Sequence, residues 1–135
     1  MLRSIRQLQQ GKIQEFGEAL TAFLADIPYS MRRKDSERER ERYFQYTFFL
    51  LLRMLSCFTV YIEKEQSQGR VDCIVEVPGY VYIFEFKLDG SAQEALRQIE
   101  EKGYARPYAT DSRKLFRIGV NFSSETGTIS EFMVE

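Results

Sequence analysis

The chain has 135 residues, of which 44% are apolar and 29% are charged, and its formal net charge is −1. One domain is expected, because domains typically hold about 100–200 residues, and a chain of this size buries enough surface to fold without disulfides. The sequence contains no histidine, which excludes Ser-His-Asp and Cys-His catalysis and histidine-ligated zinc. Any chemistry must therefore use carboxylates, Lys, Tyr, Ser, Cys or a metal held by oxygen ligands.

The cysteines and the apolar runs indicate the compartment. Cys57 and Cys73 are far apart in the sequence and lie in apolar runs, which favours buried thiols over a disulfide, as in a reducing cytoplasm. The N-terminus lacks the apolar core of a secretory signal. The longest apolar run, Phe48 to Leu52, is far shorter than the ~20 residues of a membrane span. We therefore expect a cytoplasmic protein without a membrane segment.

The first part of the chain is predicted to be helical. Residues 1–11 are interpreted as a tail or linker from an upstream domain. Residues 12–26 place apolar side chains at helical spacing, and Pro28 ends this helix. The charge run at residues 31–42 is interpreted as a solvated loop leading into a second helix at 36–56, whose later turns are apolar nearly all round.

The rest of the chain is predicted to contain strands and one helix. β-Branched and aromatic residues indicate strands at 58–64, 70–77, 80–88, 114–122 and 128–134. A helix is expected between the third and fourth strands, with Ser91 as its N-cap and its end near Gly103. This order predicts one α/β domain in which helices flank a central mixed sheet of about five strands.

Two acidic residues of adjacent strands are predicted to face each other. Strand alternation places Glu85 and Lys87 on the same face of their strand. A tight hairpin at Pro78-Gly79 would set the register of the two strands and place Asp72 opposite Glu85. Opposed carboxylates have Cβ atoms about 5 Å apart and repel unless a cation lies between them.

A divalent cation between Asp72 and Glu85 is one interpretation of this pair. Mg²⁺ prefers a few carboxylate oxygens together with water and phosphate oxygens. Lys87 would then position or deprotonate the attacking water, or stabilise charge on a phosphate. The alternative is an Asp-Lys-Glu salt bridge at the open end of the sheet, and the residues alone do not decide between the two. Glu76 has the parity of Asp72 but lies by the turn, where we expect it to be solvated.

The segments GRVDCIVEV, YIFEFKLDG and QIEEKGYA resemble the PD-(D/E)xK nuclease superfamily. They are similar in particular to a bacterial family in which this module follows an AAA-ATPase-like domain. The resemblance covers about residues 12–135 and implies a restriction-endonuclease-like core. It also implies a Mg²⁺-dependent deoxyribonuclease, with Mn²⁺ as a substitute metal. DNA is implied as the substrate by family analogy.

The resemblance assigns roles to individual residues. Asp72 matches the Asp of the motif, and Glu85 and Lys87 match its ExK. Gln98 matches the polar residue on the helix that follows the core strands. In that superfamily the Asp, the Glu and the carbonyl after the Glu, here that of Phe86, ligate the metal.

Three further positions bear on the match. Val71 stands in place of the usual Pro, and Lys102 stands where RecB-like members have Tyr, one helical turn after Gln98. Lys102 would contact a phosphate, and the alternative is a solvated side chain. Glu41 matches the helical acid that many members direct at the metal, and its alternative is an exposed charge paired with a neighbouring Arg.

DNA binding is expected to be weak and strongly salt-dependent. The net charge gives no general attraction, and the two local patches are modest: residues 31–42 hold six basic against four acidic residues, and residues 97–117 hold six against three. The candidate contacts to the DNA backbone are Lys102, Arg106 and Arg70.

Two other hypotheses remain open. One is a catalytically inactive nuclease-fold module that binds nucleic acid or protein. The other is the effector end of a larger ATPase, whose nucleotide would bind elsewhere because this chain has no GxxxxGK stretch. Many nucleases of the group act as dimers, so the resemblance also implies a homodimer as a candidate assembly.

Overall fold

The computed structural model describes residues 2–26, 59–65 and 70–135, and for residues 2–3, 59–65 and 70–72 it describes only the backbone. Several sequence predictions lie outside these residues: the charge run, the second helix, Cys57 and Glu41. In chain order the elements are α1 (Leu2–Gln9), α2 (Ile13–Ala25), β1 (Thr59–Glu65), β2 (Arg70–Val77), β3 (Tyr80–Leu88), α5 (Ala92–Lys102), the short 3₁₀ helix η2 (Arg106–Tyr108), β4 (Lys114–Ser123) and β5 (Thr128–Val134).

The strands form one mixed sheet of five strands in the order β1-β2-β3-β4-β5. Neighbouring strands are antiparallel except β3 and β4, which are parallel. A parallel pair needs a crossover connection, and α5 provides it. The predicted α/β class and the mixed sheet of about five strands are confirmed.

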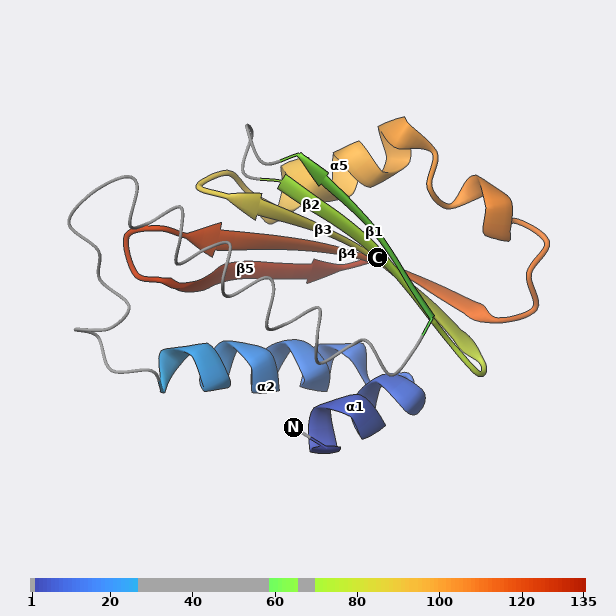
Figure 1. Ribbon diagram of the computed structural model, residues 1–135, viewed down its shortest axis with the longest axis horizontal. Helices are drawn as coiled ribbons and strands as arrows, with labels where there is room; N and C mark the ends of the chain where they lie inside the picture. Colours follow the sequence, from blue (N-terminus) through green and yellow to red (C-terminus); the bar gives the residue numbers. More distant parts are fainter. Residues whose placement is uncertain (1, 27–58, 66–69) are drawn as a thin grey trace.

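Helices cover both faces of the sheet, with α1 and α2 on one face and α5 on the other (Figure 1). The larger core lies under α1 and α2, where the rings of Phe16 and Phe84 meet edge to face at 6.2 Å. The smaller core lies under α5 and contains Ile83, Leu96 and Ile99. Neighbouring residues of β3 thus enter opposite cores, as strand alternation requires. The predicted face of β3 that carries Glu85 and Lys87 is the face under α5.

The hairpin of β2 and β3 has the predicted register. Val77 pairs with Tyr80 across a turn in which Gly79 has a φ of 88°, a conformation that favours glycine. Asp72 is consequently opposite Glu85. Cys73 is buried in the larger core as a thiol, as the sequence predicts.

The helix α1 belongs to the packing of this domain. Leu8 is fully buried, and its carbonyl oxygen accepts a hydrogen bond from the hydroxyl of Tyr82 in β3. Burial raises the pKa of Tyr82 far above its usual range, which keeps this hydroxyl protonated as a donor. Most of the segment interpreted as a tail therefore forms a helix that packs on this domain. The upstream domain stays a prediction. No helix in the described part of the chain is long and apolar enough to cross a bilayer.

Candidate functional site

The backbone register brings three acidic positions into one row across the sheet. Glu63 of β1 is opposite Asp72 of β2, and Asp72 is opposite Glu85 of β3. Directly opposed residues of antiparallel strands have Cβ atoms about 4.5–5.5 Å apart, so such a row concentrates negative charge. Glu63 is not among the predicted site residues, because the alternation of residues 58–64 served only to locate a strand. The pairing of β1 with β2 is the signal that finds it.

Glu85 is a fully buried carboxylate, with 0% of its side chain exposed. The ammonium group of Lys102, on the last turn of α5, lies 3.4 Å from its Oε1 atom. Burying a carboxylate is costly unless a positive charge and hydrogen bonds compensate for the lost water. Lys102, whose side chain is 24% exposed, provides such a charge. The residue predicted to contact a phosphate therefore contacts a proposed metal ligand in this structure.

Lys87 lies on the same face as Glu85 and contacts an acid from α5. Its Nζ atom is 3.4 Å from Oε2 of Glu94, on the first turn of that helix. The hydroxyl of Ser91 accepts a hydrogen bond from the backbone N–H of Glu94 and so caps the helix as predicted. Two ion pairs, one at each end of α5, consequently join this helix to β3.

Gly119 of β4 lets α5 approach the sheet beside Glu85, with which Gly119 pairs in the parallel ladder. A Cβ atom at position 119 would lie 2.2 Å from the carbonyl oxygen of Ala92 and 3.0 Å from Cγ of Leu96. The helix therefore packs against bare backbone, which allows Lys102 to reach Glu85. Gly119 is not among the predicted site residues. A glycine inside a strand is the available signal, because it often marks the close approach of another backbone.

The remaining residues of the predicted core site differ in their surroundings. Gln98 is half-buried on α5, one turn before Lys102. The side chain of Phe86 is buried in the larger core and stacks on Phe84 at 5.6 Å. The role that the resemblance implies for Phe86 concerns its backbone carbonyl, not this ring.

The three residues predicted to contact phosphate lie on different elements and have different surroundings. Arg70 is opposite Lys87 in the ladder, two pairs beyond Asp72 and Glu85. Arg106 is exposed on η2, in the segment that follows α5. Lys102, by contrast, is engaged by Glu85.

The prediction that Glu76 is solvated is wrong. Its side chain is 17% exposed, and its Oε1 atom lies 2.7 Å from the guanidinium of Arg113. The reason is the parallel pairing, which places Lys114 beside Tyr80 and so brings the residues before β4 to the turn end of the hairpin. Arg113 also binds Asp111 at 2.7 Å, and its hydrogen bonds lower the pKa of Asp111 to about 2.

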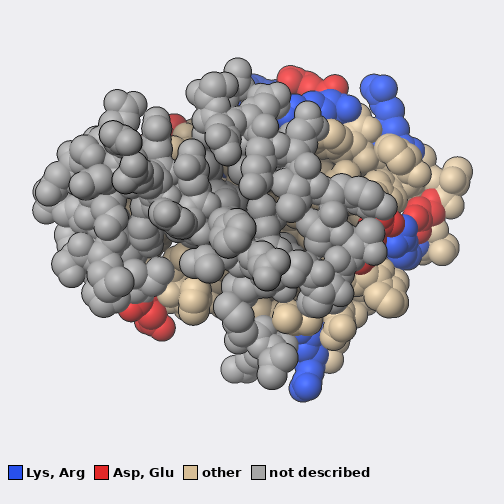
Figure 2. Space-filling model, in the orientation of Figure 1, with Lys and Arg blue, Asp and Glu red and all other residues tan. Residues whose placement is uncertain are grey.

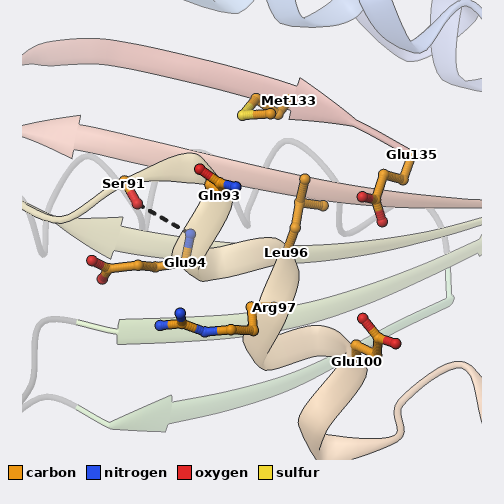
Figure 3. A pocket seen from close by; sticks show the side chains of 8 residues that line it. All are labelled: Ser91, Gln93, Glu94, Leu96, Arg97, Glu100, Met133 and Glu135. Atoms are coloured by element: carbon orange, nitrogen blue, oxygen red, sulfur yellow. Dashed lines mark hydrogen bonds between the residues drawn. The ribbon is translucent and has the colours of Figure 1, made fainter.

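The charges of the described surface are mixed. On the face seen in Figure 2, acidic and basic atoms lie side by side at the top and right edges, while a few charged groups stand apart at the lower edge. A groove of about 580 Å³ lies between α5 and the end of β5 (Figure 3). Its charged lining is three acids, Glu94, Glu100 and Glu135, and one base, Arg97. An acidic groove repels phosphate, so we do not place nucleic acid there.

The donor set of the acidic row fits a hard divalent cation such as Mg²⁺. Carboxylate oxygens are the ligands that this ion prefers, and a buried acid such as Glu85 requires a nearby cation. Among the side chains that the structure describes, no group of three acidic or thiol ligands comes together. Glu41 lies outside the described residues, and only the backbone is described for Glu63 and Asp72.

Comparison with known proteins gives a family and a relative. Residues 39–132 match the PD-(D/E)XK nuclease superfamily. The chain is also 35% identical over 117 residues to an uncharacterised protein in the vnfD 5′ region of Azotobacter chroococcum mcd 1, which covers 85% of this chain and 22% of that protein. The chain thus spans about a fifth of that relative's length. No solved structure matches the chain. The chain belongs to the PD-(D/E)XK nuclease superfamily, a family that implies a restriction-endonuclease-like fold.

Proposed function

We propose that this protein is a divalent-metal-dependent nuclease that hydrolyses phosphodiester bonds of DNA. The observation that carries the proposal is the register that places Asp72 opposite Glu85, with Lys87 two residues further along the same face. Family membership supports phosphodiester chemistry.

The acidic residues would hold the metal, either Mg²⁺ or Mn²⁺ in its place. Asp72, Glu85 and the backbone carbonyl of Phe86 are the proposed ligands, and Glu41 is a further candidate. When bound, the metal would supply Lewis-acid stabilisation of the negative charge that develops on the scissile phosphate.

The other residues would act on water and on the DNA backbone. Lys87 would position the attacking water or remove its proton. Gln98 would support this arrangement from α5. The basic side chains proposed to bind phosphates of the DNA are Arg106 and Arg70, together with Lys102 when it is released from Glu85.

The test is a nuclease assay on plasmid and single-stranded DNA with Mg²⁺ and with Mn²⁺. We expect Asp72→Asn, Glu85→Gln and Lys87→Ala each to lower cleavage by at least about a hundredfold, the scale of a lost catalytic group. The matched control is Glu76→Gln, because Glu76 has the same strand parity as Asp72 but lies at the other end of β2. Its glutamine can still accept a hydrogen bond from Arg113, so cleavage should persist. Unchanged metal-dependent cleavage in Glu85→Gln would sink the proposal.

A second candidate is a nuclease-fold module that binds nucleic acid or protein without cleaving it. The observation that favours it is that both central charges already have ion-pair partners, Glu85 with Lys102 and Lys87 with Glu94. Calorimetric titration with Mn²⁺ separates the two candidates. A folded protein that binds no Mn²⁺ would favour the binding module. A neighbouring ATPase-like domain and a homodimer stay predictions.

A further inference from the structure

Lys102 lies where a cation is needed at the proposed metal site. Its ammonium group is 3.4 Å from a carboxylate that has no exposed surface, and that carboxylate is the end of the acidic row Glu63, Asp72 and Glu85. A metal bound to Glu85 and the ammonium of Lys102 would be two positive charges at one carboxylate. At such short separations like charges repel strongly, above all where water is excluded.

The contact between Lys102 and Glu85 is also loose. Charge-assisted N–H···O bonds have lengths of about 2.7–2.9 Å, the length seen between Arg113 and Glu76 at 2.7 Å. The 3.4 Å distance at Glu85 is well beyond this range. Lys102 is partly exposed and stands on the last turn of α5, before Gly103, so its flexible side chain can swing into solvent without moving the helix.

We propose that Lys102 is an internal counter-ion that a divalent metal must displace from Glu85. The proposal rests on the proposed function, because it assumes that Glu85 is a metal ligand. Without metal, Lys102 compensates for the charge of the buried carboxylate. With metal, that compensation comes from the ion, and the ammonium leaves. The competition lowers the affinity of the site for metal, because part of the binding free energy is used to break the ion pair.

The experiment is a calorimetric titration of the whole chain with Mn²⁺, in the absence of DNA. We expect Lys102→Gln to bind Mn²⁺ about tenfold more tightly than the unaltered protein, which corresponds to about 1.4 kcal/mol. The matched control is Arg97→Gln, which removes one positive charge from the exposed side of the same helix, where Arg97 pairs with Glu101. Its affinity should change by no more than about twofold, because exposed charges are screened by salt.

A second variant keeps the proposal testable if Lys102→Gln does not fold without metal. Lys102→Arg retains the charge, and its guanidinium binds carboxylates at least as well, so its affinity for Mn²⁺ should equal that of the unaltered protein or be lower. Tighter binding by Lys102→Arg would overturn the proposal. Equal binding by the unaltered protein and Lys102→Gln would overturn it and leave the metal site in place. A folded protein that binds no Mn²⁺, with or without Lys102, would overturn the proposed function as well.

Discussion

Gly119 shows how a residue without a side chain can determine the site. It pairs with Glu85 in the ladder, and the backbone of α5 at Ala92 occupies the space that a Cβ atom would fill. Any larger residue would push the start of α5 away from the sheet. Since Lys102 stands on the same helix, its distance to Glu85 depends on this contact.

We expect Gly119→Ala to lower the free energy of unfolding by about 2–3 kcal/mol, because the new methyl group meets a backbone oxygen that cannot move aside. Urea unfolding measures this. The control is Gly90→Ala, where the nearest atom is Cδ of the flexible Lys87 side chain at 3.3 Å, and where we expect a loss below about 1 kcal/mol. Equal losses in the two variants would contradict the role given to Gly119.

Single residues show where prediction from sequence stops. The pairing of Asp72 with Glu85 could be predicted, because a two-residue turn and strand alternation determine it. The contact between Lys102 and Glu85 could not, because it depends on how closely α5 approaches the sheet. One contact of that approach is with Gly119, which is seventeen positions beyond Lys102 in the sequence.

At the scale of elements, the strands and α5 were predictable nearly to the residue. Their signals are local: β-branched and aromatic runs for the strands, and Ser91 and Gly103 as caps of the helix. The helix α1 was not predicted, because residues 1–11 were interpreted as a tail, although Leu2, Ile5 and Leu8 recur at helical spacing in LRSIRQLQ. Among the side chains described in this helix, Leu8 is the one that is fully buried. The salt bridge between Glu76 and Arg113 was not predicted, because it depends on the parallel pairing of β3 and β4, which brings Arg113 to the hairpin turn.

The ion pair between Asp111 and Arg113 should make the free energy of unfolding depend on pH. The pKa of Asp111 is lowered from 3.8 to about 2 in the folded chain, so its stabilising effect is complete above the unfolded pKa and is lost as the pH falls from about 4 to about 2. Urea unfolding between pH 5 and pH 2 should show this loss. Asp111→Asn should be less stable than the unaltered protein at pH 5, and the difference should shrink toward pH 2.

The control for this pH dependence is Glu125→Gln, which removes an exposed acid from the turn between β4 and β5. A plot of its free energy of unfolding against pH should run parallel to that of the unaltered protein. If the plot for Asp111→Asn also ran parallel to that of the unaltered protein, the ion pair with Arg113 would not contribute to folding.

At the scale of the whole molecule, the basic and acidic residues are nearly equal in number, and several bases of the described part are paired with acids. Arg113 pairs with Glu76 and Asp111, Lys102 with Glu85, and Arg97 with Glu101. The near balance follows from composition alone, because the chain has 19 basic and 20 acidic residues. Which bases have acidic partners could not be predicted, since the partners come from different elements.

We expect weak DNA binding whose logarithmic affinity falls with the logarithm of the salt concentration with a slope of about −2, as for two phosphate contacts, because Lys102 is paired with Glu85 in metal-free buffer. Fluorescence anisotropy with a labelled duplex in metal-free buffer measures this slope. Arg106→Gln should reduce its magnitude by about one, because Arg106 is exposed. Arg97→Gln should leave the slope unchanged. A slope about twice as steep would contradict the assignment of binding to these few bases.

The parallel pairing of β3 with β4 has a consequence for the order of folding. β2, β3 and α5 follow one another within residues 70–102, while β4 begins only at Lys114. Hairpins close early because their loops are short, whereas a parallel strand must await its crossover. We therefore expect the acidic row to form while Glu85 is still in water. Its burial, and the arrival of Lys102, come together in the late step in which α5 docks on Gly119.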